Sequence, residues 1–157
     1  MFCPAIKCGL LFSSVSKLHE HELTAARPII FGSILRTLNH VYAMGQVWKA
    51  HLQGASHDLS TRNPEICPLL DELRMVQQDI DDGYICYAGS LPQADTDEIV
   101  AFTFIGGGAG SMSCEDILLH VVNHATYHRG HIADMMHECS VKPPTTDLPV
   151  FFKNGFA

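Results

Sequence analysis

A chain of 157 residues is the length of one domain, which can bury about two-thirds of the surface of its unfolded form, so neither disulfides nor metals are required for folding. The net charge of −7, with only ten scattered Lys and Arg residues, excludes the basic surface that a nucleic-acid partner needs. The chain has no apolar run of the roughly 18 residues that a membrane span needs. Its six cysteines include no Cys-x-x-Cys pair, and the first residues do not contain the apolar core of a signal peptide. Both observations predict a cytoplasmic protein with reduced thiols.

A long amphipathic helix is predicted from about residues 26–28 to Gly54. Before it, residues 1–16 show no clear period, because proline, glycine and three serines interrupt them, and any helix there is expected to be short, displaced or irregular. From Phe31 to Leu52 apolar residues recur at spacings of three and four, which is typical of a helix facing a core. Pro28 is expected in its first turn. His40 lies beside the apolar stripe.

The next helix is predicted over Glu65 to Asp82, with Asn63 as its N-cap and Gly83 at its end. Residues 84–88 and 98–105 are rich in β-branched and aromatic types, so they are expected to pair as a short β-hairpin. The glycine-rich segment at 106–110 lacks the Lys-Ser/Thr of a phosphate-binding loop and is expected to be a flexible joint.

The last long helix is predicted over residues 114–139, with Ser113 as its cap and two prolines, at 143 and 144, that prevent its continuation. His120, His124 and His128 recur at intervals of four, and four residues of helix turn through roughly 400°, so the three share one face.

Two imidazoles at this spacing can chelate one divalent cation, although a chain with ten histidines also produces such a pair by chance. Metalloprotease helices carry a catalytic Glu directly after the first His, and here that position is Ala125. Any chemistry would therefore need another base. His131 and His137 lie off the shared face and are expected to be peripheral.

The motif TLNH…W…L-x-G, followed by NHATYHRGHI and PP-x-x-D-L, resembles the DinB-like (DinB/YfiT-like) family of metal-binding four-helix bundles over about residues 22–152. The resemblance implies an all-α fold, a single DinB-like domain over residues 1–157 and an up-down-down-up bundle, with a short β-hairpin or irregular insertion between helices 3 and 4. It also implies a divalent-metal site at His40, His124 and His128, with His120 as the competitor for a ligand role. The pattern YN-x-W-x-N, usual in the family's first helix, is absent.

Three neutral imidazoles leave a coordination position open, as in reactive rather than structural sites, and they suit zinc and nickel equally. Relatives of this fold include thiol-dependent S-transferases and a mycothiol-dependent isomerase. The resemblance therefore implies a metal-dependent S-transferase or hydrolase acting on a small-molecule substrate, with a low-molecular-weight thiol as a candidate cofactor. The alternatives are a non-catalytic metal- or ligand-binding module of stress response and a bundle whose histidines are core residues. A homodimer is expected, with neither nucleic acid nor membrane as a partner.

Overall fold

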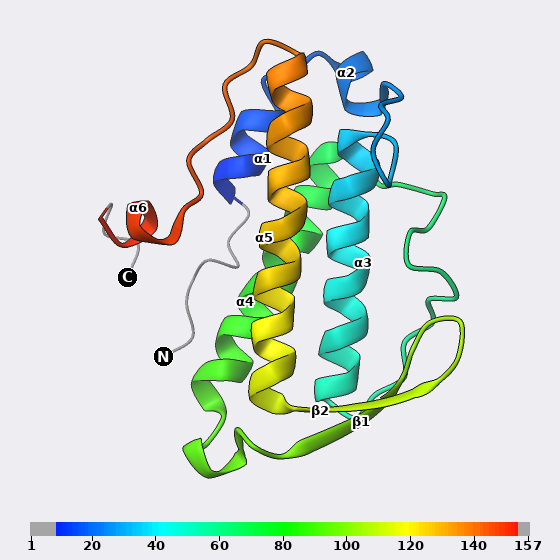
Figure 1. Cartoon of the computed structure of the whole chain (residues 1–157), viewed down its shortest axis with the longest axis vertical. Helices are drawn as coiled ribbons and strands as arrows, with labels where there is room; N and C mark the ends of the chain where they lie inside the picture. Colours follow the sequence, from blue (N-terminus) through cyan, green and yellow to red (C-terminus); the bar gives the residue numbers. More distant parts are fainter. Residues whose placement is uncertain (1–8, 154–157) are drawn as a thin grey trace.

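The computed structural model describes residues 9–153, whose helices form an elongated bundle (Figure 1). Three long helices make its body: α3 (Ile34–Leu52), α4 (Leu70–Ser90) and α5 (Cys114–Glu138). The helices α3 and α4 run in one direction, whereas α5 and the short α1 (Gly9–Val15) run in the other (Figure 1). The short α2 (Glu20–Thr24) lies at the upper end, and α6 (Leu148–Lys153) belongs to the C-terminal segment. The predicted bundle with a hairpin insertion is confirmed. Of the atypical segment predicted at residues 1–16, residues 1–8 lie outside the described part of the chain.

The helix α3 begins at Ile34, later than the predicted 26–28, because the residues before it form a tight turn. The Arg27 amide donates to the Gly32 carbonyl at 2.8 Å, and Gly32 has φ +77°, in the left-handed region that favours glycine. Ser33 then caps the helix by accepting from the Arg36 amide. The Arg27 side chain holds this turn in place, because it forms ion pairs with Glu22 and with Glu138.

The predicted bounds of the next helix are wrong at both ends, because α4 begins at Leu70 and continues through Gly83 to Ser90. Asn63 is not its N-cap; residues 64–69 belong to no helix or strand, and the Glu72 carboxylate accepts from the Leu69 amide at 3.1 Å to start the helix. The predicted strand at 84–88 is also wrong, because Tyr84 is helical and buried, and its hydroxyl donates to the Gly45 carbonyl of α3 at 2.7 Å. Tertiary packing here overrides local β-propensity.

The hairpin consists of β1 (Ile99–Thr103) and β2 (Ala109–Ser113), so the strand predicted at 98–105 exists but pairs with a different partner. The glycine-rich joint is its turn: Gly106, Gly107 and Gly108 all have φ between +94° and +101°, which other residues rarely adopt. In β2, a Cβ on Gly110 would lie 2.6 Å from the Phe102 ring. Glycine at 110 therefore leaves room for Phe102, which is buried.

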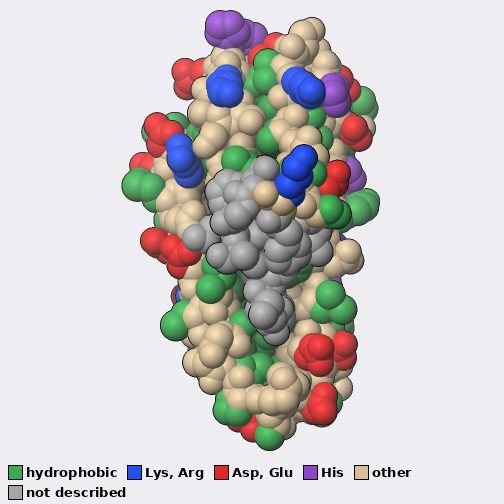
Figure 2. Space-filling view, turned by 90° about the vertical axis from the view of Figure 1, so that its left-hand side faces the viewer, with side chains coloured by type: hydrophobic (Ala, Val, Ile, Leu, Met, Phe, Trp, Pro, Cys, Tyr) green, Lys and Arg blue, Asp and Glu red, His purple; other side chains and the backbone are tan. Residues whose placement is uncertain are grey.

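Two apolar clusters fill the bundle. The upper one joins α1, α4 and the ends of α3 and α5, and the lower one packs Trp48, Tyr84 and Phe102 against α5. Within the described residues four cysteines are free thiols, Cys67, Cys86, Cys114 and Cys139; Cys3 and Cys8 lie outside them. The chain from 9 to 153 contains no helix long and apolar enough to cross a membrane. On the face shown in Figure 2 the Lys and Arg side chains stand apart from one another, with Asp and Glu side chains on the same face.

Candidate metal centre

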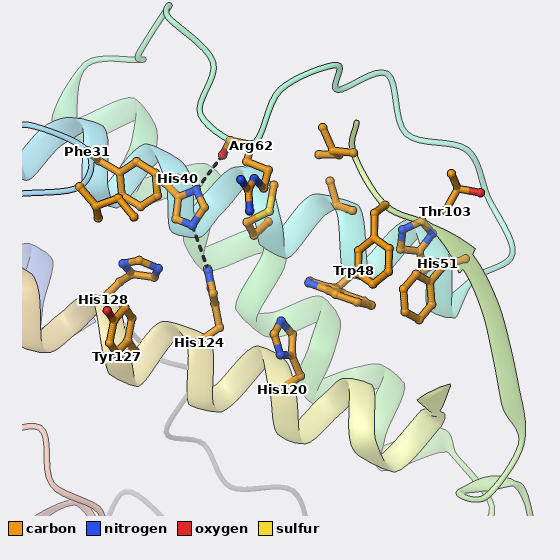
Figure 3. A pocket seen from close by; sticks show the side chains of 16 residues that line it. Phe31, His40, Trp48, His51, Arg62, Thr103, His120, His124, Tyr127 and His128 are labelled. Carbon is orange, nitrogen blue, oxygen red and sulfur yellow. Dashed lines mark hydrogen bonds between the residues drawn. The ribbon is translucent and has the colours of Figure 1, made fainter. Parts of the chain in front are cut away.

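The structure brings together the three histidines that the family resemblance singled out. His124 and His128 project from successive turns of α5, and His40 faces them from the middle of α3 (Figure 3). One nitrogen from each ring lies within 4.8 Å of the others, and the Nε2 atoms of His40 and His124 are 3.0 Å apart. The helices α3 and α5 pack directly on each other, so the cluster sits at the contact between them.

The orientation of His40 is fixed by the loop between α3 and α4. Its Nδ1 lies 2.7 Å from the Arg62 carbonyl oxygen, which can only accept, so Nδ1 carries the proton. The lone pair of the neutral ring is then on Nε2, which faces His124. Phe31 stacks on the other side of the ring, with centroids 3.9 Å apart. A carbonyl bonded to the outer nitrogen of a histidine is the usual way in which proteins orient a metal ligand.

The cluster is held neutral at physiological pH. Burial, followed by the neighbouring imidazoles, lowers the pKa of His124 from 6.5 to about 3. Burial, then His40 and His131, lowers the pKa of His128 to about 4. Burial also lowers the pKa of His40; the hydrogen bond that His40 donates to the Arg62 carbonyl opposes this shift, and the Arg62 guanidinium adds to it. Neutral imidazoles with free lone pairs are the form that binds cations.

These residues fit a divalent ion. Nitrogens at about 2.0–2.1 Å from one tetrahedral ion stand about 3.4 Å apart. In this cluster the Nε2 atoms of His40 and His124 are 3.0 Å apart, and all three nitrogens lie within 4.8 Å of one another, so the spacing suits such an ion. Nδ1 of His128 is buried without a hydrogen-bond partner, a condition that is rare unless a ligand or water satisfies the atom. Among residues 9–153 these three histidines form the one group able to hold a metal ion. That they do so stays a prediction.

The cluster closes one end of a cavity of about 670 Å³ between α3, α5, the hairpin and the loop before α4. His120 lines this cavity one turn from His124, but it lies outside the donor group and contacts Trp48 edge-on, with centroids 4.9 Å apart. His131 lies against Tyr127 and His128 and does not line the cavity, and His137 is exposed. The peripheral positions expected for these two agree with the structure.

Sequence reasoning missed several residues of the cavity wall. His51 lies on the same face of α3 as His40, Met44 and Trp48, and their spacing of four, four and three is a signal that would have found it. No pattern in the sequence points to Arg62 or Phe102 as cavity residues. They lie on a loop and in a hairpin, whose positions relative to α3 cannot be predicted from spacing. Their place beside the histidines depends on how the connections fold back on α3.

The DinB family matches this chain over residues 8–154, nearly its full length. The chain belongs to the DinB family. The DinB fold is also supported by a solved structure, a DinB-like protein from Bacillus cereus ATCC 10987 in crystal form at 2.01 Å resolution. That chain superposes with a TM-score of 0.66 at 14% identity, over 86% of this chain and 87% of its own. At this identity the likeness shows the fold alone. The curated proteins include no match to the sequence.

Proposed function

We propose that this DinB protein binds one divalent ion, zinc or nickel, at His40, His124 and His128 and catalyses transfer to the sulfur of a small thiol. The observation that carries the proposal is the convergence of three neutral imidazoles at the end of a cavity large enough for small molecules. An ion at such a site supplies Lewis acidity and lowers the pKa of a bound thiol or water.

The cavity wall supports thiol transfer over hydrolysis. Among the described residues that line the cavity, none is Asp or Glu, so a water nucleophile would find no carboxylate base and would depend on an imidazole such as that of His51 or His120. A thiol is far more acidic than water, so it forms its reactive anion with less help from a base. In the proposed step the thiolate sulfur donates an electron pair to an electrophilic carbon, and a carbon–sulfur bond forms. The bond between that carbon and the leaving group breaks, the leaving group departs with the electron pair of the broken bond, and the thiol proton passes to solvent.

The protein's own residues have positioning roles in this scheme. The Arg62 carbonyl holds His40 in the tautomer that presents Nε2, and Phe31 covers the ring. Trp48 and Phe102, with ring centroids 4.9 Å apart, give the far end of the cavity an aromatic wall. That wall suits an apolar part of the electrophile.

The same lack of carboxylates favours one alternative, a non-catalytic metal- or ligand-binding module. Purified protein would be analysed for metal, loaded with zinc or nickel, and assayed with glutathione, bacillithiol and mycothiol against a generic electrophile. The enzyme is supported if chelator abolishes the transfer, if His124→Ala does not catalyse it, and if His131→Ala still does. Bound metal without turnover with any thiol would favour the module, and a protein that takes up no metal would refute the metal site on which the enzyme and a metal-binding module both depend.

A further inference from the structure

Arg62 is a cation with no anion beside it. Its side chain lines the cavity and is exposed, and within residues 9–153 its guanidinium makes no hydrogen bond or ion pair. An exposed arginine without a partner on an open surface would be unremarkable. This one stands between the imidazole cluster and Trp48 in Figure 3, inside the proposed site.

The position of Arg62 is built into the fold. Its carbonyl is tied to His40 at 2.7 Å, so the backbone of residue 62 cannot move away without releasing the histidine. Pro64, two residues further on, also contacts α3, because the Asn39 side-chain amide donates to the Pro64 carbonyl at 3.4 Å. The guanidinium is thereby kept at the cavity although it lies on a loop.

The charge distribution around Arg62 is the opposite of that of the whole chain. The protein carries seventeen acidic and ten basic residues, yet the described cavity wall holds one arginine, five histidines and no carboxylate. A cation beside a cation-binding site is electrostatically costly unless an anion sits between the two.

We infer that the Arg62 guanidinium binds an anionic group, a carboxylate, of the small molecule that occupies this cavity, while Trp48 and Phe102 contact its apolar or aromatic part. The inference rests on the proposed function for what that molecule then does, and names its class as a small organic anion with an apolar body. Arginine suits this role because its planar fork can donate two parallel hydrogen bonds to a carboxylate.

The test uses Trp48, the only tryptophan of the chain, as a reporter inside the cavity. Quenching of its fluorescence would be titrated with 4-nitrobenzoate and with the neutral 4-nitrobenzamide, at low ionic strength, in chelator-treated and in zinc-loaded protein. The chelator-treated arm decides the inference, because a carboxylate cannot there gain affinity by binding metal. The wild type is expected to bind the benzoate about tenfold more tightly than the benzamide, as a charge-assisted hydrogen bond gives.

The variants separate Arg62 from general charge. Arg62→Gln is expected to bring the two ligands within about twofold, Arg62→Lys to keep part of the preference, and Arg74→Gln, an exposed arginine of α4 outside this cavity, to keep all of it. Thermal melts check that each variant is folded. Equal affinities in the wild type, no quenching by either ligand, or a preference that survives Arg62→Gln would overturn the inference.

The two proposals fail separately. A carboxylate preference in chelated protein that depends on Arg62, together with no zinc binding or no thiol transfer, would leave the anion site standing and remove the metal-dependent function. Zinc binding and thiol transfer without any carboxylate preference would remove the anion site alone.

Discussion

Replacing His124 with alanine tests the centre of the site most directly. His124 shares the cluster with His40 at 3.0 Å and with His128 at a centroid distance of 4.5 Å, and its loss leaves two imidazoles on different helices. The direct cost to the metal-free fold is expected to be small, on the order of 1 kcal/mol for one hydrogen bond at a cavity that water can enter. The apolar clusters above and below the site stay intact.

The effect on metal-linked stability is larger. A ligand at 100 times its Kd stabilises the native state by about 2.7 kcal/mol, and a domain of this size gains about 2–4 °C in Tm per kcal/mol. Zinc at that excess should therefore raise the Tm of the wild type by about 5–11 °C. In His124→Ala the rise should nearly vanish, and metal content should fall with it.

The assay is a thermal melt with zinc and with chelator, paired with metal stoichiometry of the desalted protein. His131→Ala is the matched control, a histidine on the same helix outside the donor group, and it should behave as the wild type does. An equal zinc-induced rise in His124→Ala and wild type would refute the site. Low metal content in every protein, with His124→Ala destabilised by a few kcal/mol, would instead favour a core histidine.

Three further predictions concern pH, packing and assembly. The pKa values of His124 and His128 lie below the ordinary 6.5, so the unfolded chain binds more protons between about pH 6.5 and pH 3. Metal-free protein should keep the stability that these neutral histidines contribute above pH 6.5 and lose that contribution on acidification through this window. The loss should be weaker in His124→Ala. Urea midpoints at several pH values measure it, and identical profiles of the two proteins would contradict it. Tyr84→Phe removes the buried hydrogen bond to the Gly45 carbonyl and should cost about 1 kcal/mol in urea unfolding with metal content unchanged, whereas an unaltered midpoint would show the bond to be neutral. Light scattering at micromolar concentration should give a dimer, since several apolar side chains are exposed, Ile66 at 87% among them, and a monomeric mass would remove that expectation.

Local pattern was sufficient for the last helix and its histidines. The Ser113 cap, the bounds of α5 and the shared face of His124 and His128 all follow from positions three or four residues apart, which a helix places together whatever surrounds it. The apolar stripe of α3 was equally legible, although its start was not, because the turn at Arg27 and Gly32 depends on contacts with α2 and α5.

Tertiary structure decided the rest. Local β-propensity predicted a strand at Tyr84, but burial of its ring and the bond to Gly45 keep it in α4, and the hairpin then forms further along the chain. No local pattern predicts that the Arg62 carbonyl reaches His40, twenty-two residues earlier. A single sequence records which residues can share a helix face, because that is set by backbone geometry. Which loop closes over that face is set by packing between segments far apart in the chain, and so the wall of this site became visible only in the folded protein.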